Sequence, residues 1–434
     1  MISQRAYRMA IVPYAAILVF GCFIGLYFRR DQEIRVLLPW SIGSGLSLAF
    51  FWFIREDSIW IMPFVAVVLL LLIVQLFLYR KNIKKIVLRL VLYFLPILVL
   101  VTADLTQRAI NYSHYGIFST NDRSDTEFGK MMSYLYKIED KQAADDVWVS
   151  NQTIEKVMSV SPTFASIRTE ITDSLAAWMG GQDACGDVIL WALRDAATWA
   201  GYYEDAVTAN QFWGKVNDEI KEAIENGSLK TDHLIRFSSM SKGTTWSKIP
   251  FFIKKTLKGM FSVGMYKDTG LSYDNKSAGE MEDIRKFEAL LGSFGNYPQI
   301  SDSISTYTQN AIKVGNSIVG VFKGLAPFSF VLAILGYLIA TVHILRHLVK
   351  MHKFDGMIDM WLVITALLLS SLVLTFGVMF FCSWFPPRMS VYLNFYNAGS
   401  YALLQIAKYL AIYCGVKLTV NYLKKSKPFR PLEG

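Results

Sequence analysis

The chain has 434 residues, of which 53% are hydrophobic and 14% aromatic, so its composition is too apolar for an ordinary soluble protein. Its net charge of +9 arises outside the central stretch: residues 105–324 hold 23 Lys and Arg against 27 Asp and Glu, which leaves 21 against 8 elsewhere. A nucleic-acid-binding protein would carry its basic residues on the soluble part, so this distribution argues against that class.

Apolar runs of membrane length flank the central stretch. A crossing needs about 20 mostly apolar residues in helical form, because hydrocarbon offers the backbone no other hydrogen-bond partner. The sequence predicts an all-α integral membrane protein with seven transmembrane helices and a mainly helical domain at 105–324. Four predicted crossings precede this domain and three follow it, at about 9–28, 36–54, 59–79, 86–104, 325–345, 358–384 and 394–420. The last is interrupted by Asn394, Asn397, Gln405 and Lys408, whereas the first six are clear.

The orientation follows from the basic residues of the short loops, which favour the cytoplasmic side. Lys and Arg gather after the first, third and fifth apolar runs and in the tail that follows residue 420. This pattern predicts a plasma-membrane protein with its N-terminus and domain outside and its C-terminus in the cytoplasm. Arg5 and Arg8, which this topology places outside, depart from the pattern. The first apolar run has no signal-peptide cleavage site, so we expect it to remain as a membrane helix.

Helical periodicity and end signals divide the central domain. Ser150 is a predicted N-cap, Pro162 is expected in a turn or at the first position of a helix, and Gly180-Gly181 is a predicted helix end. The stretch at 145–149 fits a short strand or an extended turn. Helices are expected at 126–138, from 152, and at 167–179, 187–203, 206–226, 280–293 and 300–322, the last leading directly into the fifth membrane helix.

A basic, aromatic-rich segment at 246–265 differs from the rest of the domain. Its apolar side chains alternate with Lys248, Lys254, Lys255 and Lys258. The pattern fits a helix lying in the membrane interface, and it also fits a packed helix with its lysines in water.

Asp104 is the weak catalytic candidate, at the predicted outer end of the fourth membrane helix. A carboxylate near the outer membrane surface could act as a general base or a metal ligand in an envelope glycan enzyme. The alternative is that it simply marks where a helix leaves the bilayer.

Candidate ligand-binding residues lie on the helix expected at 187–203. Trp191 and Trp199 flank Arg194 and Asp195, so this group could contact a carbohydrate or phosphate, with the rings supplying stacking area and the charges orientation. The alternative is a partly buried ion pair or cap contact that fixes neighbouring helices. Lys408, near the middle of the seventh predicted crossing, could bind a lipid phosphate or a carboxylate, or face protein for structural reasons.

The sequence holds no motif for the other kinds of catalytic, metal or cofactor site. Cys185 stands alone in the domain, no metal set or cofactor is expected, and nucleotide-binding, serine-hydrolase and zinc-protease signatures are absent from the sequence.

Two classes of function fit. In the first, a non-enzymatic bacterial cell-envelope protein uses its outer domain to bind a glycan, a lipid-linked intermediate or a partner protein, with membrane lipids around its helices. In the second, a membrane enzyme of lipid-linked glycan or envelope polymer synthesis acts where the domain meets the bilayer. Missing motifs favour the first class and leave the question of catalysis open. A secondary transporter is disfavoured because internal repeats are lacking.

Overall fold

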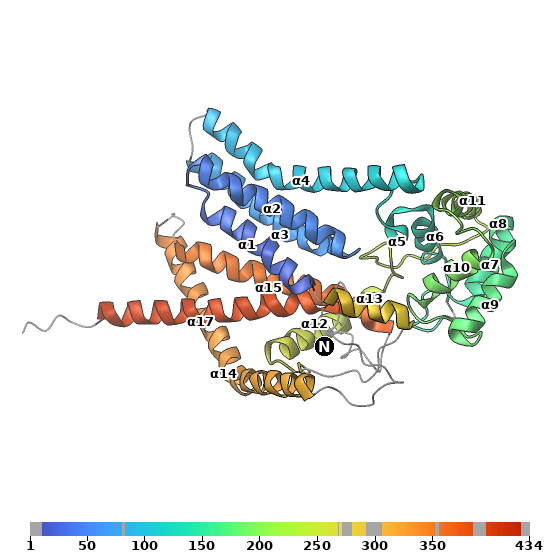
Figure 1. Ribbon diagram of the computed structural model, residues 1–434. Coiled ribbons are helices and arrows are strands. Elements are labelled where there is room, and N and C mark those ends of the chain that lie inside the picture. Colours follow the sequence, from blue (N-terminus) through green and yellow to red (C-terminus); the bar gives the residue numbers. More distant parts are fainter. Residues whose placement is uncertain are drawn as a thin grey trace, which may run out of the picture. The chain divides into compact units, whose positions relative to one another are not determined.

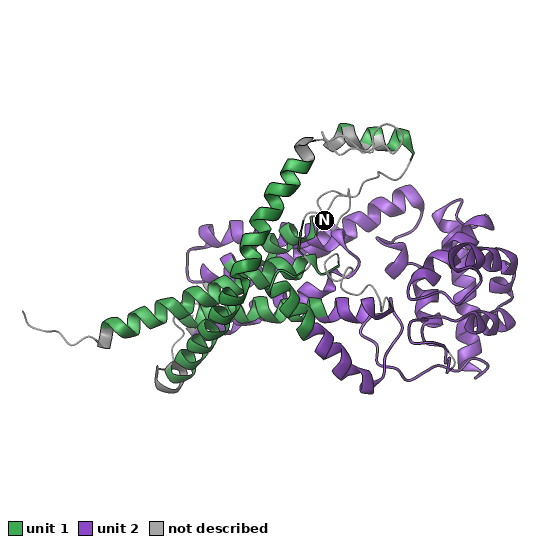
Figure 2. Ribbon diagram, turned by 90° about the horizontal axis from the view of Figure 1, so that it is seen from below, with its two compact units in different colours: residues 1–24, 257–375, 390–434 green, residues 25–256, 376–389 purple. Residues whose placement is uncertain are grey.

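The computed structural model describes residues 11–79, 83–141, 143–267, 269–270, 280–291, 306–351, 356–384 and 396–426. This part of the chain is helical and holds no β-sheet, only isolated bridges such as Val147 with Cys185. The stretch at 145–149 is therefore a turn rather than a strand. The chain forms two compact units (Figure 2), residues 1–24, 257–375 and 390–434 in one, and residues 25–256 and 376–389 in the other.

Six helices within the described ranges are long and apolar enough to cross a membrane. They fit a multi-pass, membrane-embedded protein. These helices are α2 (Ile34–Ile54), α3 (Met62–Tyr79, after the 3-10 turn η3, Ser58–Ile61), α4 (Ile83–Tyr115), α14 (Thr306–Met351), α15 (Gly356–Phe381) and α17 (Ala398–Ser426). The first predicted crossing corresponds to α1 (Val12–Phe28), which has 17 residues. Its predicted start at 9, and the predicted seventh-helix start at 394, lie outside the described residues.

Small residues allow close helix packing in each unit. In the second, a Cβ added to Gly45 of α2 would lie 2.8 Å from Val99 Cβ of α4, and Ser41 of α2 donates a hydrogen bond to the Leu92 carbonyl. In the first, α14 crosses α17 at Gly336 and Gly415, where neither helix has room for a side chain. Such contacts provide the van der Waals packing that holds helices together in lipid.

Two membrane helices are longer than a bilayer crossing requires. The fourth was expected to stop at 104, whereas α4 continues to Tyr115 (Figure 1). Side-chain pairs four residues apart extend it, since Arg108 binds Asp104 and Gln107 binds Asn111. As predicted, the helix before the fifth crossing continues into it, and the two form the single helix α14.

The domain helices begin and end largely where local signals predicted. Ser150 accepts a hydrogen bond from Thr153 N, Pro162 opens its helix, and Gly180 ends another in the left-handed conformation. The helices are α5 (Asp122–Asp125), α6 (Glu127–Leu135), α7 (Asn151–Val160), α8 (Pro162–Ala165), α9 (Arg168–Met179), α10 (Val188–Trp199), α11 (Ala206–Glu225), α12 (Ile249–Gly264, after the 3-10 turn η4, Trp246–Lys248) and α13 (Met281–Leu291).

The core of the domain lies among α6 to α11. Trp213 of α11 is completely buried, and Phe128 and Phe212 pack their rings against it. The buried alanines of α10 let α9 approach closely, and Ser174 of α9 donates a 2.7 Å hydrogen bond to the Ala192 carbonyl. This rigid core positions the outer faces of α9 and α10. The sequence predicts a division into residues 1–104, 105–324 and 325–434 according to which parts lie in the bilayer. The two compact units are defined by contacts within the chain and do not test it, so this division stays a prediction.

Candidate functional site

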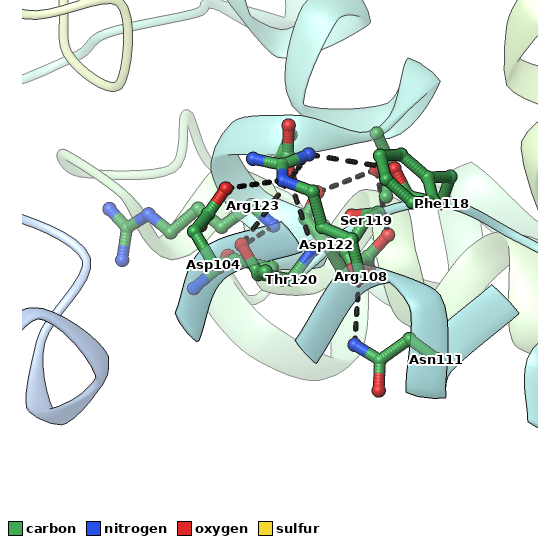
Figure 3. Close-up of polar contacts among 11 residues, drawn as sticks. Asp104, Arg108, Asn111, Phe118, Ser119, Thr120, Asp122 and Arg123 are labelled. Atoms are coloured by element: carbon green, nitrogen blue, oxygen red, sulfur yellow. Dashed lines mark hydrogen bonds and ion pairs between the residues drawn. The ribbon is translucent and has the colours of Figure 1, made fainter. Parts of the chain in front are cut away.

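Asp104 does not lie free at a helix end. Its carboxylate accepts a 2.7 Å bond from Nε of Arg108, one turn further along α4, and Arg108 also pairs at 2.7 Å with Asp125 of α5 (Figure 3). About a quarter of each of these three side chains is exposed. Arg108 therefore joins the last turns of α4 to the first helix of the domain.

The connection between α4 and α5 folds back onto α4. Asn111 donates a 2.7 Å hydrogen bond to the Ser119 carbonyl, and the Thr120 amide donates to Asp125 (Figure 3). Gly116, with φ of 73°, lets the chain turn out of α4. These contacts satisfy polar groups of the connection without a ligand.

Arg194 of α10 contacts α5, the short helix that follows the α4–α5 connection. Its guanidinium pairs with Asp122 at 3.4 Å and lies over the ring of Tyr203. Burial, and next the charge of Asp122, raise the pKa of the Tyr203 hydroxyl. A second ion pair, Arg123 with Asp187 at 3.0 Å, also joins α5 to the start of α10. Arg194 thus serves as a link between α5 and α10, the structural alternative for this residue.

Asp195, next to Arg194 in sequence, belongs to a different surface. Successive residues of a helix are about 100° apart, whereas positions i, i+4 and i+8 share one face. Trp191, Asp195 and Trp199 have this spacing on α10, and Trp178 of α9 donates a 2.8 Å hydrogen bond from Nε1 to Asp195 Oδ2. We name these four residues the tryptophan face.

The tryptophan face is open to its surroundings. The exposed fractions of Trp178, Trp191 and Trp199 are 45%, 43% and 53%. Three exposed indoles around one carboxylate are unusual, because large aromatic side chains normally bury most of their area. The sequence prediction placed Arg194 here and missed Trp178. The position of Trp178 in the last turn of the helix expected at 167–179 was the only available signal.

Lys408 is buried and bound by protein. Its Nζ donates to the Gly264 carbonyl at 3.3 Å and lies 4.5 Å and 5.1 Å from the ring centres of Tyr266 and Tyr409. One turn earlier, Gln405 Nε2 donates to the Val263 carbonyl at 2.8 Å. Lys408 and Gln405 of α17 therefore satisfy carbonyls at the end of α12, where a helix carries partial negative charge. This geometry favours the structural alternative for Lys408.

Cys185 lies beside an acidic residue rather than a base. Its Sγ is 3.7 Å from Asp146 Oδ2, and burial, followed by the charge of Asp146, raises the pKa of the thiol. A nucleophilic cysteine needs the opposite environment, one that stabilises the thiolate.

Comparison with known proteins adds nothing to this geometry, because no family model, curated protein or solved structure matches the chain.

Proposed function

We propose that the helical domain is a non-catalytic module that binds an envelope glycan on the tryptophan face, while the membrane helices anchor it. The observation that carries the proposal is the grouping of Trp178, Trp191 and Trp199 around Asp195 on the exposed side of α9 and α10. The basic short loops support an outward-facing domain in a bacterial plasma membrane, as the sequence predicts.

The chemistry of the tryptophan face suits a sugar chain. Indole rings offer large, rigid apolar surfaces for the C–H faces of sugars, and a carboxylate accepts hydrogen bonds from hydroxyl groups. Trp191 and Trp199 lie about 12 Å apart along the helix axis, at about 1.5 Å per residue. This span fits an oligosaccharide better than a single sugar. Trp178 fixes one oxygen of Asp195, so the carboxylate needs little reordering when a ligand arrives.

The enzyme alternative has less support. Its one sequence candidate, Asp104, is engaged by Arg108 and faces the polar contacts of the α4–α5 connection. A general base held in this way would have to break an ion pair before it could accept a proton.

Calorimetric titration of the full chain in lipid nanodiscs tests the proposal. The probes are tetrasaccharides of N-acetylglucosamine and of glucose. Trp191→Ala and Trp199→Ala should each weaken binding about tenfold, equivalent to about 1.4 kcal/mol. Trp246→Ala removes an indole that is 78% exposed outside the tryptophan face, so it is the matched control and should leave binding unchanged.

Two results would overturn the proposal. One is the absence of binding to either tetrasaccharide in the wild-type chain. The other is equal binding by Trp191→Ala, Trp199→Ala and the control. A protein captured only by the wild-type face, without glycan binding, would replace the glycan with a partner protein, for which exposed tryptophans are also suited.

A further inference from the structure

Helix α12 has one packed face and one face whose large apolar side chains the described residues leave about half exposed. Phe252, Thr256 and Val263 are buried, at 4%, 2% and 0% exposure. Ile253 and Leu257, one turn apart, are 48% and 57% exposed, and Phe261 continues their row at 42%. A row of large apolar side chains at spacing i, i+4, i+8 is a continuous apolar strip.

Lysines border this strip. Lys254 and Lys258 follow Ile253 and Leu257 by one residue each, and both side chains are exposed. A long lysine stem can run along an apolar surface while its ammonium group reaches a polar layer. An apolar strip with bordering cations has the chemistry of a helix that lies on an anionic bilayer.

The end of α12 contacts two membrane helices of its unit, each near one end of the predicted crossing. Its last carbonyls bind Gln405 and Lys408 of α17, and Phe261 packs on Phe330 of α14 with ring centres 5.4 Å apart. Counting about 20 residues back from Lys424, the basic end of the α17 span, reaches Gln405. The same count from Arg346 in α14 reaches Pro327, less than one turn from Phe330.

The start of α12 contacts a third membrane helix within the second unit. Phe252 packs against Phe376 and Phe380 of α15, with ring centres 6.5 Å and 5.3 Å apart. About 20 residues counted forward from Gly356, where α15 begins, reach Phe376. Each of these contacts therefore lies about 20 residues from the opposite end of its membrane helix, where hydrocarbon gives way to head groups.

We propose that α12 is an interfacial helix that inserts Ile253, Leu257 and Phe261 among acyl chains and pairs Lys254 and Lys258 with the phosphates of anionic lipids. This proposal is independent of glycan binding. It assigns a lipid-binding surface to the basic segment, whose two interpretations the sequence left open.

A site-specific fluorescent probe tests the insertion. The four native cysteines are replaced by alanine in the full chain, and an environment-sensitive nitrobenzoxadiazole label is attached at Leu257→Cys. Lys221→Cys on exposed α11 is the matched control. In nanodiscs with dibrominated acyl chains, the probe at 257 should be quenched strongly and protected from iodide, and the probe at 221 should behave oppositely. A probe at 257 that iodide quenches and brominated lipid does not would overturn the proposal.

A charge reversal tests the lysines. The double change Lys254→Glu, Lys258→Glu is made in the chain labelled at 257. It should reduce bromolipid quenching in nanodiscs that contain phosphatidylglycerol and in nanodiscs of phosphatidylcholine alone. The reduction should be at least twofold larger in the nanodiscs that contain phosphatidylglycerol. The control reverses Lys215 and Lys221 of α11, which should change neither. If the Lys254 and Lys258 change reduces quenching equally in both lipids, or in neither, head-group recognition is refuted. Ile253→Cys provides a second label site should Leu257→Cys fail to fold.

Discussion

The indole of Trp384 lies directly over Gly186, so that a Cβ at this glycine would overlap the ring. Trp384 belongs to the 3-10 turn η5 (Cys382–Trp384), which follows membrane helix α15, and Gly186 precedes α10 of the domain. The indole also packs edge-on to Trp148, with ring centres 6.4 Å apart. The end of a membrane helix thus forms part of the domain core.

We predict that Gly186→Ala destabilises the domain by about 2–5 kcal/mol. Its φ of 54° costs an alanine about 1–2 kcal/mol, and overlap with Trp384 adds about 1–3 kcal/mol. Gly181→Ala is the matched control, because Gly181 has φ of 79° and open space around its Cβ, so only the conformational cost applies. Thermal unfolding of the full chain in detergent measures both, at about 2–4 °C per kcal/mol. Equal shifts for the two variants would contradict the packing of Trp384.

Loss of Arg108 should destabilise the α4–α5 junction by about 1–3 kcal/mol, because it leaves Asp104 and Asp125 facing each other without a cation. The partial exposure of the three groups, and screening by solvent, keep the value within this range. Asp104→Asn added to Arg108→Ala should recover part of the loss, which a double-mutant cycle of unfolding free energies detects. Lys130→Ala, which breaks an exposed 3.2 Å pair with Glu127, should cost less than about 0.5 kcal/mol. An Arg108 variant as stable as the Lys130 variant would refute the bridging role.

The stability that Asp205 gives to α11 should depend on pH. Hydrogen bonds from the backbone and side chain of Thr208 lower the pKa of this N-cap carboxyl. Because the folded pKa is lowered, the stabilisation is complete above the unfolded value of about 3.9 and disappears as pH falls through the folded value. The melting-temperature gap between wild type and Asp205→Ala should therefore shrink on acidification from pH 6 to pH 3, values chosen to bracket the unfolded pKa of about 3.9. Asp205→Asn keeps an acceptor and should show a smaller gap; a gap that widens on acidification would exclude this mechanism.

Cys185 should react slowly with iodoacetamide near neutral pH, since burial and the neighbouring Asp146 disfavour its thiolate. Asp146→Asn should accelerate alkylation several-fold by removing the adjacent negative charge. Asp173→Asn, on the exposed side of α9, is the matched control. A mass-spectrometric rate at Cys185 that Asp146→Asn leaves unchanged would show that charge does not control this thiol.

Sequence reasoning succeeded where the signal is local. The chemistry of Ser150 predicted an N-cap, that of Pro162 a turn or a first helical position, and that of Gly180-Gly181 a helix end. The structure has Ser150 as an N-cap, Pro162 at the start of a helix and Gly180 at the end of another. The long apolar helices followed from hydropathy in the same way.

Sequence reasoning failed where the partner of a side chain lies far away in the chain. Arg194 and Asp195 were grouped because they are adjacent, but the partner of Arg194 is Asp122, 72 positions away, and Asp195 instead binds Trp178. The fourth helix continues past its apolar run because polar pairs such as Asp104 with Arg108 extend it. A hydropathy profile does not detect such pairs. The role of Trp384 in the domain core also requires tertiary structure, since about 185 residues of chain (384 − 199) separate it from the end of α10.

Fluorine NMR of the full chain labelled with 5-fluorotryptophan tests glycan binding on the tryptophan face most directly. Single Trp→Phe variants assign the resonances of Trp178, Trp191, Trp199 and Trp246. On addition of the N-acetylglucosamine or glucose tetrasaccharide, we expect the first three resonances to shift together with one dissociation constant, while that of Trp246 stays in place. Resonances of the tryptophan face that stay unchanged at saturating concentrations of both sugars, or a shift confined to Trp246, would contradict glycan binding on this face.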